Sequence, residues 1–110
     1  MTSQPFEKIA LAARVVEEEM KRVGYWSAEP CPEFNPNELY GGATFESWLQ
    51  FEYLPKVSRA VEVLSLVDLP QYRVGLAALR QYDYHSSIPE AHILMSACFE
   101  LERVLDAVHA

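Results

Sequence analysis

The sequence predicts an all-α fold, a four-helix bundle with three long amphipathic helices and one short helix. Three segments repeat their apolar residues in steps of three and four, which places those side chains on one face of an α-helix. No useful length of chain alternates apolar and polar residues with the period of two that is typical of a half-buried strand. The 110 residues suit a single domain, residues 1–110, and their 50% hydrophobic content argues against disorder.

The first long helix is predicted over residues 6–23. Ser3 fits the N-cap position and Pro5 suits the first turn. Gly24 can adopt the left-handed conformation that often ends a helix. The apolar stripe of this helix consists of Phe6, Ile9, Ala13, Val16, Met20 and Val23.

A long loop rich in aromatic residues and proline follows, over residues 25–43. Its three prolines and the adjacent Gly41 and Gly42 oppose a regular element. Loops of more than about 12–15 residues are uncommon in a compact domain and are usually packed down, functional or mobile. Large rings in the loop favour packing, because they would otherwise lie in water; they are Tyr25, Trp26, Phe34 and Tyr40.

The second helix is predicted to follow an N-cap at Thr44 and to contain Pro55, which cannot donate a backbone hydrogen bond. On a wheel that advances about 100° per residue, it carries two apolar stripes about 100° apart. The first consists of Phe45, Trp48 and Leu49, and the second of Tyr53, Leu54, Val57, Ala60, Val61 and Leu64. A straight helix could not bury both stripes against one core, so we predict a kink or short break near Pro55. The alternative is a tolerated kink without this role.

Two further helices complete the predicted bundle. A turn at residues 68–70 ends the second helix. The short helix is predicted over residues 74–82, which are apolar nearly all round, although Gly75 weakens it. The last helix is predicted over residues 89–108, with Pro89 in its first turn. Its stripe, widened by Met95, consists of Ala91, Leu94, Cys98, Leu101, Leu105 and Val108.

The start of the second helix resembles the motif of a known family. Thr44-Phe45-Glu46-Ser47-Trp48-Leu49-Gln50-Phe51, followed by Leu54-Pro55-Lys56, is similar to the W-L-Q…(I/L)-P-(R/K) signature of the YqcC-like proteins, which are small uncharacterised bacterial proteins. Trp26, Leu69-Pro70 and the last helix match in the same order, so the resemblance covers nearly the whole chain. Residues 38–43 and 75–84 depart from the pattern. The resemblance implies an all-α bundle and an association with a tRNA pseudouridine synthase.

Charge and composition disfavour several function classes. The formal net charge is −7, from 16 acidic and 9 basic residues, and no run of basic residues is present. We therefore expect no direct nucleic-acid binding and no binding to anionic membranes, because both depend on basic surfaces. Residues 1–10 lack the features of a signal peptide and no apolar run approaches the ~20 residues that span a bilayer, so we expect a cytoplasmic protein. Cys31 and Cys98 are expected to be free thiols.

The sequence contains no catalytic, cofactor-binding or metal-binding motif that stands out. His85, His92 and His109 have neither H-x-x-x-H nor E-x-x-H spacing. Asp106 and His109 could share a helix face, but a metal site needs three or four convergent ligands. The glycine-rich motifs of nucleotide sites and the G-x-S-x-G motif of hydrolases are also lacking. We therefore expect a protein that is not an enzyme and that uses no metal and no cofactor.

The candidate binding site is an aromatic groove between the long loop and the second helix. Phe51 lies on neither apolar stripe, so the core explains it least, and Gln50 and Lys56 would form the polar edge. The residues of this site are Trp26, Phe34, Tyr40, Trp48, Gln50, Phe51, Pro55 and Lys56. The alternative is that these rings only pin the loop over the core.

The function expected from these observations is a non-enzymatic interaction or accessory protein, which binds a protein partner or itself in a homo-oligomer. One alternative is the binding of a small molecule or peptide in the aromatic groove. The other alternative, implied by the resemblance alone, is an accessory factor in tRNA pseudouridine modification.

Overall fold

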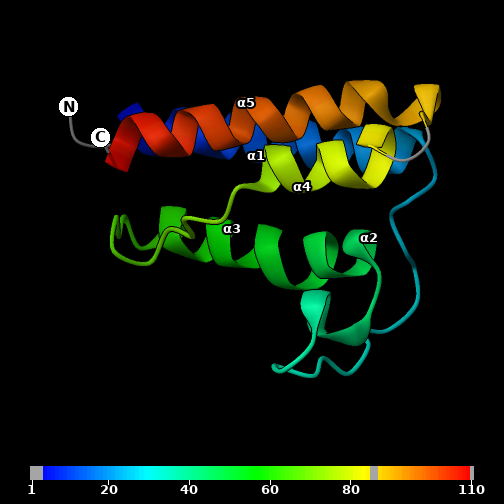
Figure 1. Ribbon diagram of the computed structural model, residues 1–110. Helices are drawn as coiled ribbons and strands as arrows, with labels where there is room; N and C mark the ends of the chain where they lie inside the picture. Colours follow the sequence, from blue (N-terminus) through cyan, green and yellow to red (C-terminus); the bar gives the residue numbers. More distant parts are fainter. Residues whose placement is uncertain (1–3, 85–86, 110) are drawn as a thin grey trace.

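The computed structural model, which describes residues 4–84 and 87–109, is an all-α four-helix bundle (Figure 1). Three long helices and one short helix form it, as predicted, and the described residues contain no strand. The helical elements are α1 (Gln4–Arg22), η1 (Leu39–Gly42), α2 (Phe45–Trp48), η2 (Leu49–Tyr53), α3 (Leu54–Glu62), α4 (Val74–Leu79), η3 (Arg80–Tyr84), η4 (Pro89–Ala91) and α5 (His92–His109). The run α2–η2–α3 is one continuous helix.

The helices α1 and α5 lie antiparallel and side by side, and the other helices pack on this pair (Figure 1). α4 packs on α5, and α3 packs on α1. The predicted stripe of α1 is buried apart from Val23, which is half-buried. The predicted stripe of the last helix is buried apart from Met95 and Val108, which are also half-buried. Each large side chain buried in this way contributes roughly 1.5–3 kcal/mol.

The end of α1 confirms the role predicted for Gly24. Gly24 has a φ of 83°, in the left-handed region. The N–H of Gly24 donates to the carbonyl of Lys21 at 3.2 Å, and the N–H of Tyr25 donates to the carbonyl of Met20 at 2.8 Å. These bonds satisfy carbonyl groups that have no partner within the helix. The cap predicted at Ser3 lies outside the described residues.

A π-helical turn, rather than a kink at Pro55, changes the buried face of the second helix. The N–H of Leu54 donates to the carbonyl of Leu49, five residues back, whereas an α-helical bond reaches four residues back. The turn therefore holds one extra residue, which is worth about 100° on the α-helical wheel. Both stripes consequently face the core, with Phe45, Leu49, Tyr53, Leu54, Val57 and Ala60 each no more than 5% exposed.

This geometry corrects the position predicted for the reorientation. The change occurs in η2 (Leu49–Tyr53), and Pro55 follows it in the first turn of α3. A proline is tolerated there because it directly follows the π-type bond of Leu54, where the regular α-helical hydrogen-bond pattern is already interrupted. The helix also starts as predicted, since Oγ1 of Thr44 accepts a hydrogen bond from the N–H of Ser47 at 3.0 Å.

Three predicted members of the two stripes of this helix are not fully buried. Trp48 and Val61 are half-buried and pack against the core, whereas Leu64 is 56% exposed. Leu64 has a φ of 52° and follows the last turn of α3, where the N–H of Ser65 donates to the carbonyl of Ala60 at 2.9 Å. Leu64 is therefore the left-handed residue that ends the helix, and the prediction that it belongs to the buried stripe is wrong.

A buried carboxylate from α5 holds the start of α4. Glu102 is 7% exposed, and its Oε1 accepts hydrogen bonds from the N–H groups of Gly75 at 3.0 Å and Leu76 at 3.4 Å. Nη2 of Arg73 lies 3.6 Å from the other carboxylate oxygen. Because α4 has only six residues, it would not be stable alone, and Glu102 supplies the acceptor that its first N–H groups lack.

Gly75 allows α4 to approach α5 closely. A Cβ at this position would lie 2.5 Å from Cδ1 and 2.8 Å from Cα of Phe99. The second contact is with backbone, so a side chain at position 75 would push the two helices apart. The glycine that weakens the helix in isolation is thus required by the packing of α4 on α5.

We expect removal of one residue from the π turn to preserve the bundle. Deletion of Glu52 together with Pro55→Ala should give a regular α-helix whose buried residues still share one face. Deletion of Arg14, an equally short change in the middle of α1, should rotate the stripe that follows it by about 100° out of the core. In urea unfolding, the first variant should have the higher midpoint. A midpoint equal to or lower than that of the Arg14 deletion would show that η2 is not an inserted residue.

We expect Glu102→Gln to lower the free energy of unfolding by about 1–2 kcal/mol, because a neutral amide is a weaker acceptor than a carboxylate for the N–H groups of α4. The matched control is Glu100→Gln on the same helix, where the exposed pair with Arg103 is broken and a much smaller change is expected. Equal midpoints for the two variants in urea unfolding would contradict the capping role of Glu102.

Candidate functional site

Seven aromatic rings form one connected network between the long loop, the second helix and the α4 region. The ring centroids of Tyr25 and Tyr82 lie 5.8 Å apart, and Tyr82 lies 5.9 Å from Phe45. Phe45 and Trp48 lie 5.4 and 5.3 Å from Tyr40, and Trp48 also contacts Tyr53 at 5.2 Å and Tyr72 at 4.9 Å. These separations suit favourable aromatic pairs. The network connects the buried core to the surface at Tyr40 and Tyr72.

Gln50 clamps the long loop to the second helix. Its Oε1 accepts a hydrogen bond from the N–H of Ser27 at 2.8 Å, and its Nε2 donates to the carbonyl of Ser27 at 2.9 Å. Gln50 is 6% exposed, so these bonds are shielded from water. Beside the clamp, Trp26 packs half-buried against the core, with Nζ of Lys21 5.1 Å from its ring centroid. The clamp therefore fixes the entry of the loop.

Residues 39–42 form a left-handed turn at the far end of the loop. Tyr40 has φ 53° and ψ 31°, and Gly41 and Gly42 also have positive φ values. This conformation costs roughly 1–2 kcal/mol for a residue other than glycine. The turn places the Tyr40 ring on the aromatic network and leaves Leu39 73% exposed. Strained residues of this kind gather at functional sites.

An open cavity of about 520 Å³ lies between the turn and the second helix, and we call it the loop groove. Its polar edge includes an ion pair, with Nζ of Lys56 3.7 Å from Oε2 of Glu52. Four of the predicted groove residues line it, namely Phe34, Tyr40, Trp48 and Lys56, together with Asn35, Pro36, Glu38, Gly41 and Glu52. The other four predicted residues, Trp26, Gln50, Phe51 and Pro55, do not line it.

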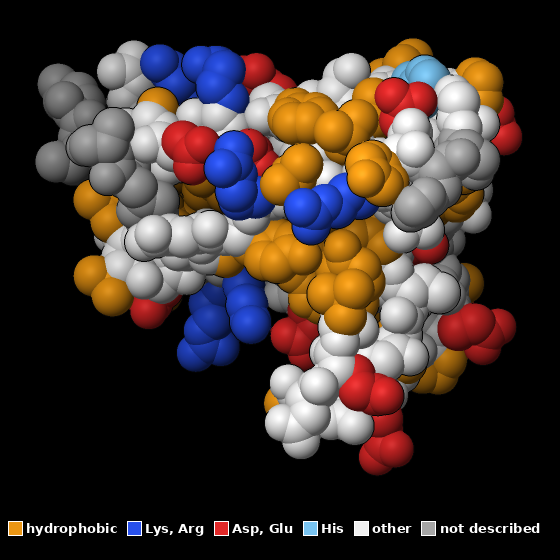
Figure 2. All heavy atoms as spheres, viewed as in Figure 1, with side chains coloured by type: hydrophobic (Ala, Val, Ile, Leu, Met, Phe, Trp, Pro, Cys, Tyr) orange, Lys and Arg blue, Asp and Glu red, His pale blue; other side chains and the backbone are white. Residues whose placement is uncertain are grey.

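A second cavity, of about 480 Å³, lies on the other side of Tyr40 along α4, and we call it the arginine groove. Figure 2 shows hydrophobic side chains gathered over the strip between α4 and α2, with Lys or Arg side chains above it. The groove is lined by Leu39, Tyr40, Gln71, Tyr72, Arg73, Leu76, Ala77, Arg80 and Gln81. The sequence did not predict this groove, because its residues come from separate segments and no local pattern unites them.

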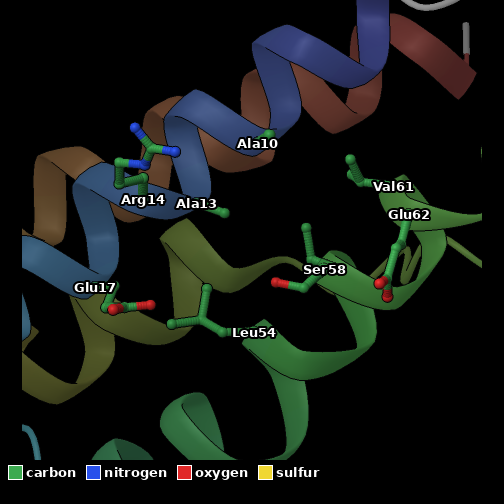
Figure 3. A pocket seen from close by; sticks show the side chains of 9 residues that line it. Ala10, Ala13, Arg14, Glu17, Leu54, Ser58, Val61 and Glu62 are labelled. Carbon is green, nitrogen blue, oxygen red and sulfur yellow. The ribbon is translucent and has the colours of Figure 1, made fainter.

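A third groove, of about 360 Å³, separates α1 from α3 (Figure 3). Ala10 and Ala13 of α1 lie across from Leu54, Ser58 and Val61 of α3 (Figure 3). The groove exists because alanine and serine leave space between the two helices. Charged residues of both signs line it, and it contains no aromatic ring among the residues that the structure describes. It therefore offers a partner less apolar surface than the arginine groove does.

Ser87, His92 and Asp83 lie together, but their geometry differs from that of a catalytic triad. Oγ of Ser87 lies 3.1 Å from Nε2 of His92, and Oδ1 of Asp83 lies 3.6 Å from the same nitrogen. In a triad, the serine and the carboxylate contact opposite ring nitrogens, so that one nitrogen takes the proton while the other is held. We therefore interpret this group as a surface hydrogen-bond cluster.

The expectations about histidines, metal ligands, membrane spans and cysteines can be compared with the structure only within the described residues. His85 and the side chain of His109 lie outside them. Within residues 4–84 and 87–109, no three His, Cys, Asp or Glu side chains gather in a way that could hold a metal ion. In the same residues, none of the helices has both the length and the apolar character needed to cross a bilayer. Cys31 is exposed and Cys98 is buried, and both are free thiols, as predicted.

Two buried tyrosines of the network differ in the partners of their hydroxyl groups. The hydroxyl of Tyr82 donates to Oε2 of Glu46 at 2.6 Å. The hydroxyl of Tyr53 is buried without a hydrogen-bond partner in the part of the chain that the structure describes. Burial raises the pKa of both hydroxyls, and at Tyr82 the hydrogen bond to Glu46 raises the pKa further.

We expect the same substitution to have opposite effects at these two positions. Tyr82→Phe should lower the free energy of unfolding by about 1–2 kcal/mol, because it removes a bond to a carboxylate. Tyr53→Phe should leave that free energy unchanged or raise it by about 1 kcal/mol, because it removes a buried hydroxyl that makes no bond. Urea unfolding measures both. A larger loss for Tyr53→Phe than for Tyr82→Phe would contradict these hydrogen-bond assignments.

The raised pKa values add a pH dependence to the same pair. A tyrosine whose pKa is raised in the folded state stabilises that state fully below the ordinary pKa of 10.0, and the contribution is lost as the pH rises above it. The wild-type protein should therefore lose folding stability as the pH rises above about 10, and each Phe variant should lose less stability over the same rise in pH. Identical alkaline transitions in all three proteins would contradict this assignment.

Comparisons of the chain with protein-family models, with curated proteins and with solved structures found no match. The resemblance to the YqcC-like proteins stays a prediction. The geometry of the surface around Tyr40 is therefore the basis for a functional proposal.

Proposed function

We propose that the protein is a non-enzymatic interaction protein whose binding surface is centred on Tyr40. The observation that supports this most is the left-handed turn at residues 39–42. It holds Leu39 73% exposed, next to two open grooves, and keeps Tyr40 in a strained conformation. The exposure of Leu39 does not stabilise the isolated chain, and it is explained if another protein covers the turn.

The residue types around the turn favour a macromolecular partner. Aromatic residues and arginine are enriched in protein interfaces, and hot spots are commonly Trp, Tyr or Arg. Sites for small molecules usually bury most of the ligand surface in a cleft, whereas both grooves beside Tyr40 are open and Leu39 stands out beside them. A protein partner, or a second copy of the chain, could cover the turn and both grooves together.

The loop groove favours one alternative, which is the binding of a small molecule or a peptide. Phe34, Tyr40 and Trp48 supply aromatic walls, and Lys56 supplies a cation at the edge. The resemblance to the YqcC-like proteins suggests what a protein partner would be, namely an enzyme of tRNA pseudouridine modification. This protein would then bind the enzyme itself and not the RNA, because a net charge of −7 opposes phosphate binding.

Photo-crosslinking tests the proposed surface. A photo-reactive amino acid is introduced at position 39, and the matched control places it at Leu11 on α1, which is 60% exposed. After irradiation in the source cells, we expect a discrete product of higher mass from position 39 and none from position 11. Mass spectrometry then identifies the partner, and a product of twice the chain mass would be a second copy.

Two outcomes would overturn the proposed function. One is equal crosslinking from positions 39 and 11, which would indicate random collisions. The other is the absence of any protein product from position 39, and a small molecule that copurifies with the chain would then support the alternative. The variant Leu39→Ser should unfold at the wild-type urea concentration, because an exposed leucine adds little to folding stability.

A further inference from the structure

We propose that the arginine groove binds an acidic, amphipathic helix of the partner protein. This inference rests on the proposed function and adds the chemistry of the partner. The helix would lie along α4, with apolar side chains in the middle of the groove and a carboxylate at each end. Helix binding in an apolar groove is a common mode of peptide recognition.

The charge of the groove is opposite to that of the chain. The sequence has a net charge of −7, yet the described residues that line this groove include Arg73 and Arg80 and no carboxylate. The loop groove on the other side of Tyr40 differs, because Glu38 and Glu52 line it. Complementary charge therefore favours a negatively charged segment in the arginine groove over the loop groove.

Both arginines have hydrogen-bond donors left for a ligand. Arg80 is exposed, and no carboxylate of the described residues lies within 4.0 Å of its guanidinium. The side chain of Arg73 is 72% exposed, and its Nη2 lies 3.6 Å from Oε2 of Glu102. A guanidinium has five N–H donors, and it can bind a carboxylate through two of them at once.

The spacing of the groove residues matches the spacing of side chains along one face of a helix over two turns. Arg73 and Arg80 flank α4 as its N-cap and C-cap, seven residues apart, which corresponds to about 10.5 Å along the axis. Leu76 and Ala77 lie between them on the same face, three and four residues after Arg73. A parallel or antiparallel partner helix with the same spacing would present acidic residues at i and i+7 and apolar residues at i+3 and i+4.

The chain itself does not contain such a segment within its 110 residues. Asp83 and Glu90 are the one pair of acidic residues seven positions apart, and serines occupy the two positions between them where apolar residues are needed. A second copy of the chain therefore lacks the pattern. The occupant that fits is a helix of a different protein.

A displayed library of helical peptides tests this inference on the intact protein. Peptides with randomised surface positions are selected on the wild-type chain and measured by fluorescence anisotropy. We expect the selected peptides to carry Asp or Glu at i and i+7 and apolar residues at i+3 and i+4. Arg80→Gln should weaken their binding about threefold to tenfold, because one charged pair at a partly exposed site is lost. High salt should remove most of that difference.

The control is Arg59→Gln on α3, an exposed arginine outside the groove, which should bind the selected peptides as the wild type does. Selected peptides without the acidic pattern, binding that Arg80→Gln leaves unchanged, or the failure to select any peptide would each overturn the inference. Crosslinking from position 39 to a protein would survive these results, so a wrong partner chemistry is distinguishable from a wrong function.

Discussion

The candidate surface depends on the hydrogen bonds between the buried carboxylate of Glu102 and the start of α4. This carboxylate accepts the first N–H groups of α4, a helix of six residues that lacks the length to be stable alone. Once α4 is fixed on α5, the arginines at its two ends and the middle of the arginine groove lie at the surface. The same helix leads into η3, where Tyr82 joins the aromatic network and bonds Glu46. One carboxylate from the core helix thus positions the cations of the surface.

The second helix supplies the other wall of this surface, and its π turn is the reason that it can. The extra residue in η2 lets Phe45 and Leu49 face the core together with Val57. Gln50, within the turn, holds Ser27 and so anchors the loop that ends at Tyr40. π turns often occur near functional sites, because the altered backbone moves side chains out of the regular pattern. Here, the turn connects the core, the loop and the aromatic network.

The proposed binding surface combines rigid and strained parts. The aromatic network holds the Tyr40 ring in place, so the neighbouring Leu39 is attached to a rigid part of the chain. Binding a partner would therefore cost little conformational entropy at this turn. The strain of the left-handed turn is balanced by the packing of the Tyr40 ring. A helix lying on α4 would cover Leu76 and the edge of Tyr72, and it would place its carboxylates beside Arg73 and Arg80.

Local patterns in the sequence were sufficient for the helices, because stripes, caps and breaks depend on residues within a few turns of one another. They identified the stripe of α1, the caps at Thr44 and Gly24, and the 100° offset around Pro55. They also placed Phe34, Tyr40, Trp48 and Lys56 around one groove. Tertiary packing decided the rest. A break in the second helix or a π turn would each compensate the 100° offset between its two apolar stripes. In the folded structure, a π turn allows both stripes to be buried. Glu102 has the sequence context of a surface residue until the N–H groups of α4 are placed beside it, and the arginine groove exists only where residues 39–40, 71–73 and α4 meet. These contacts join residues far apart along the chain, and the three-dimensional packing of the helices alone brings them together.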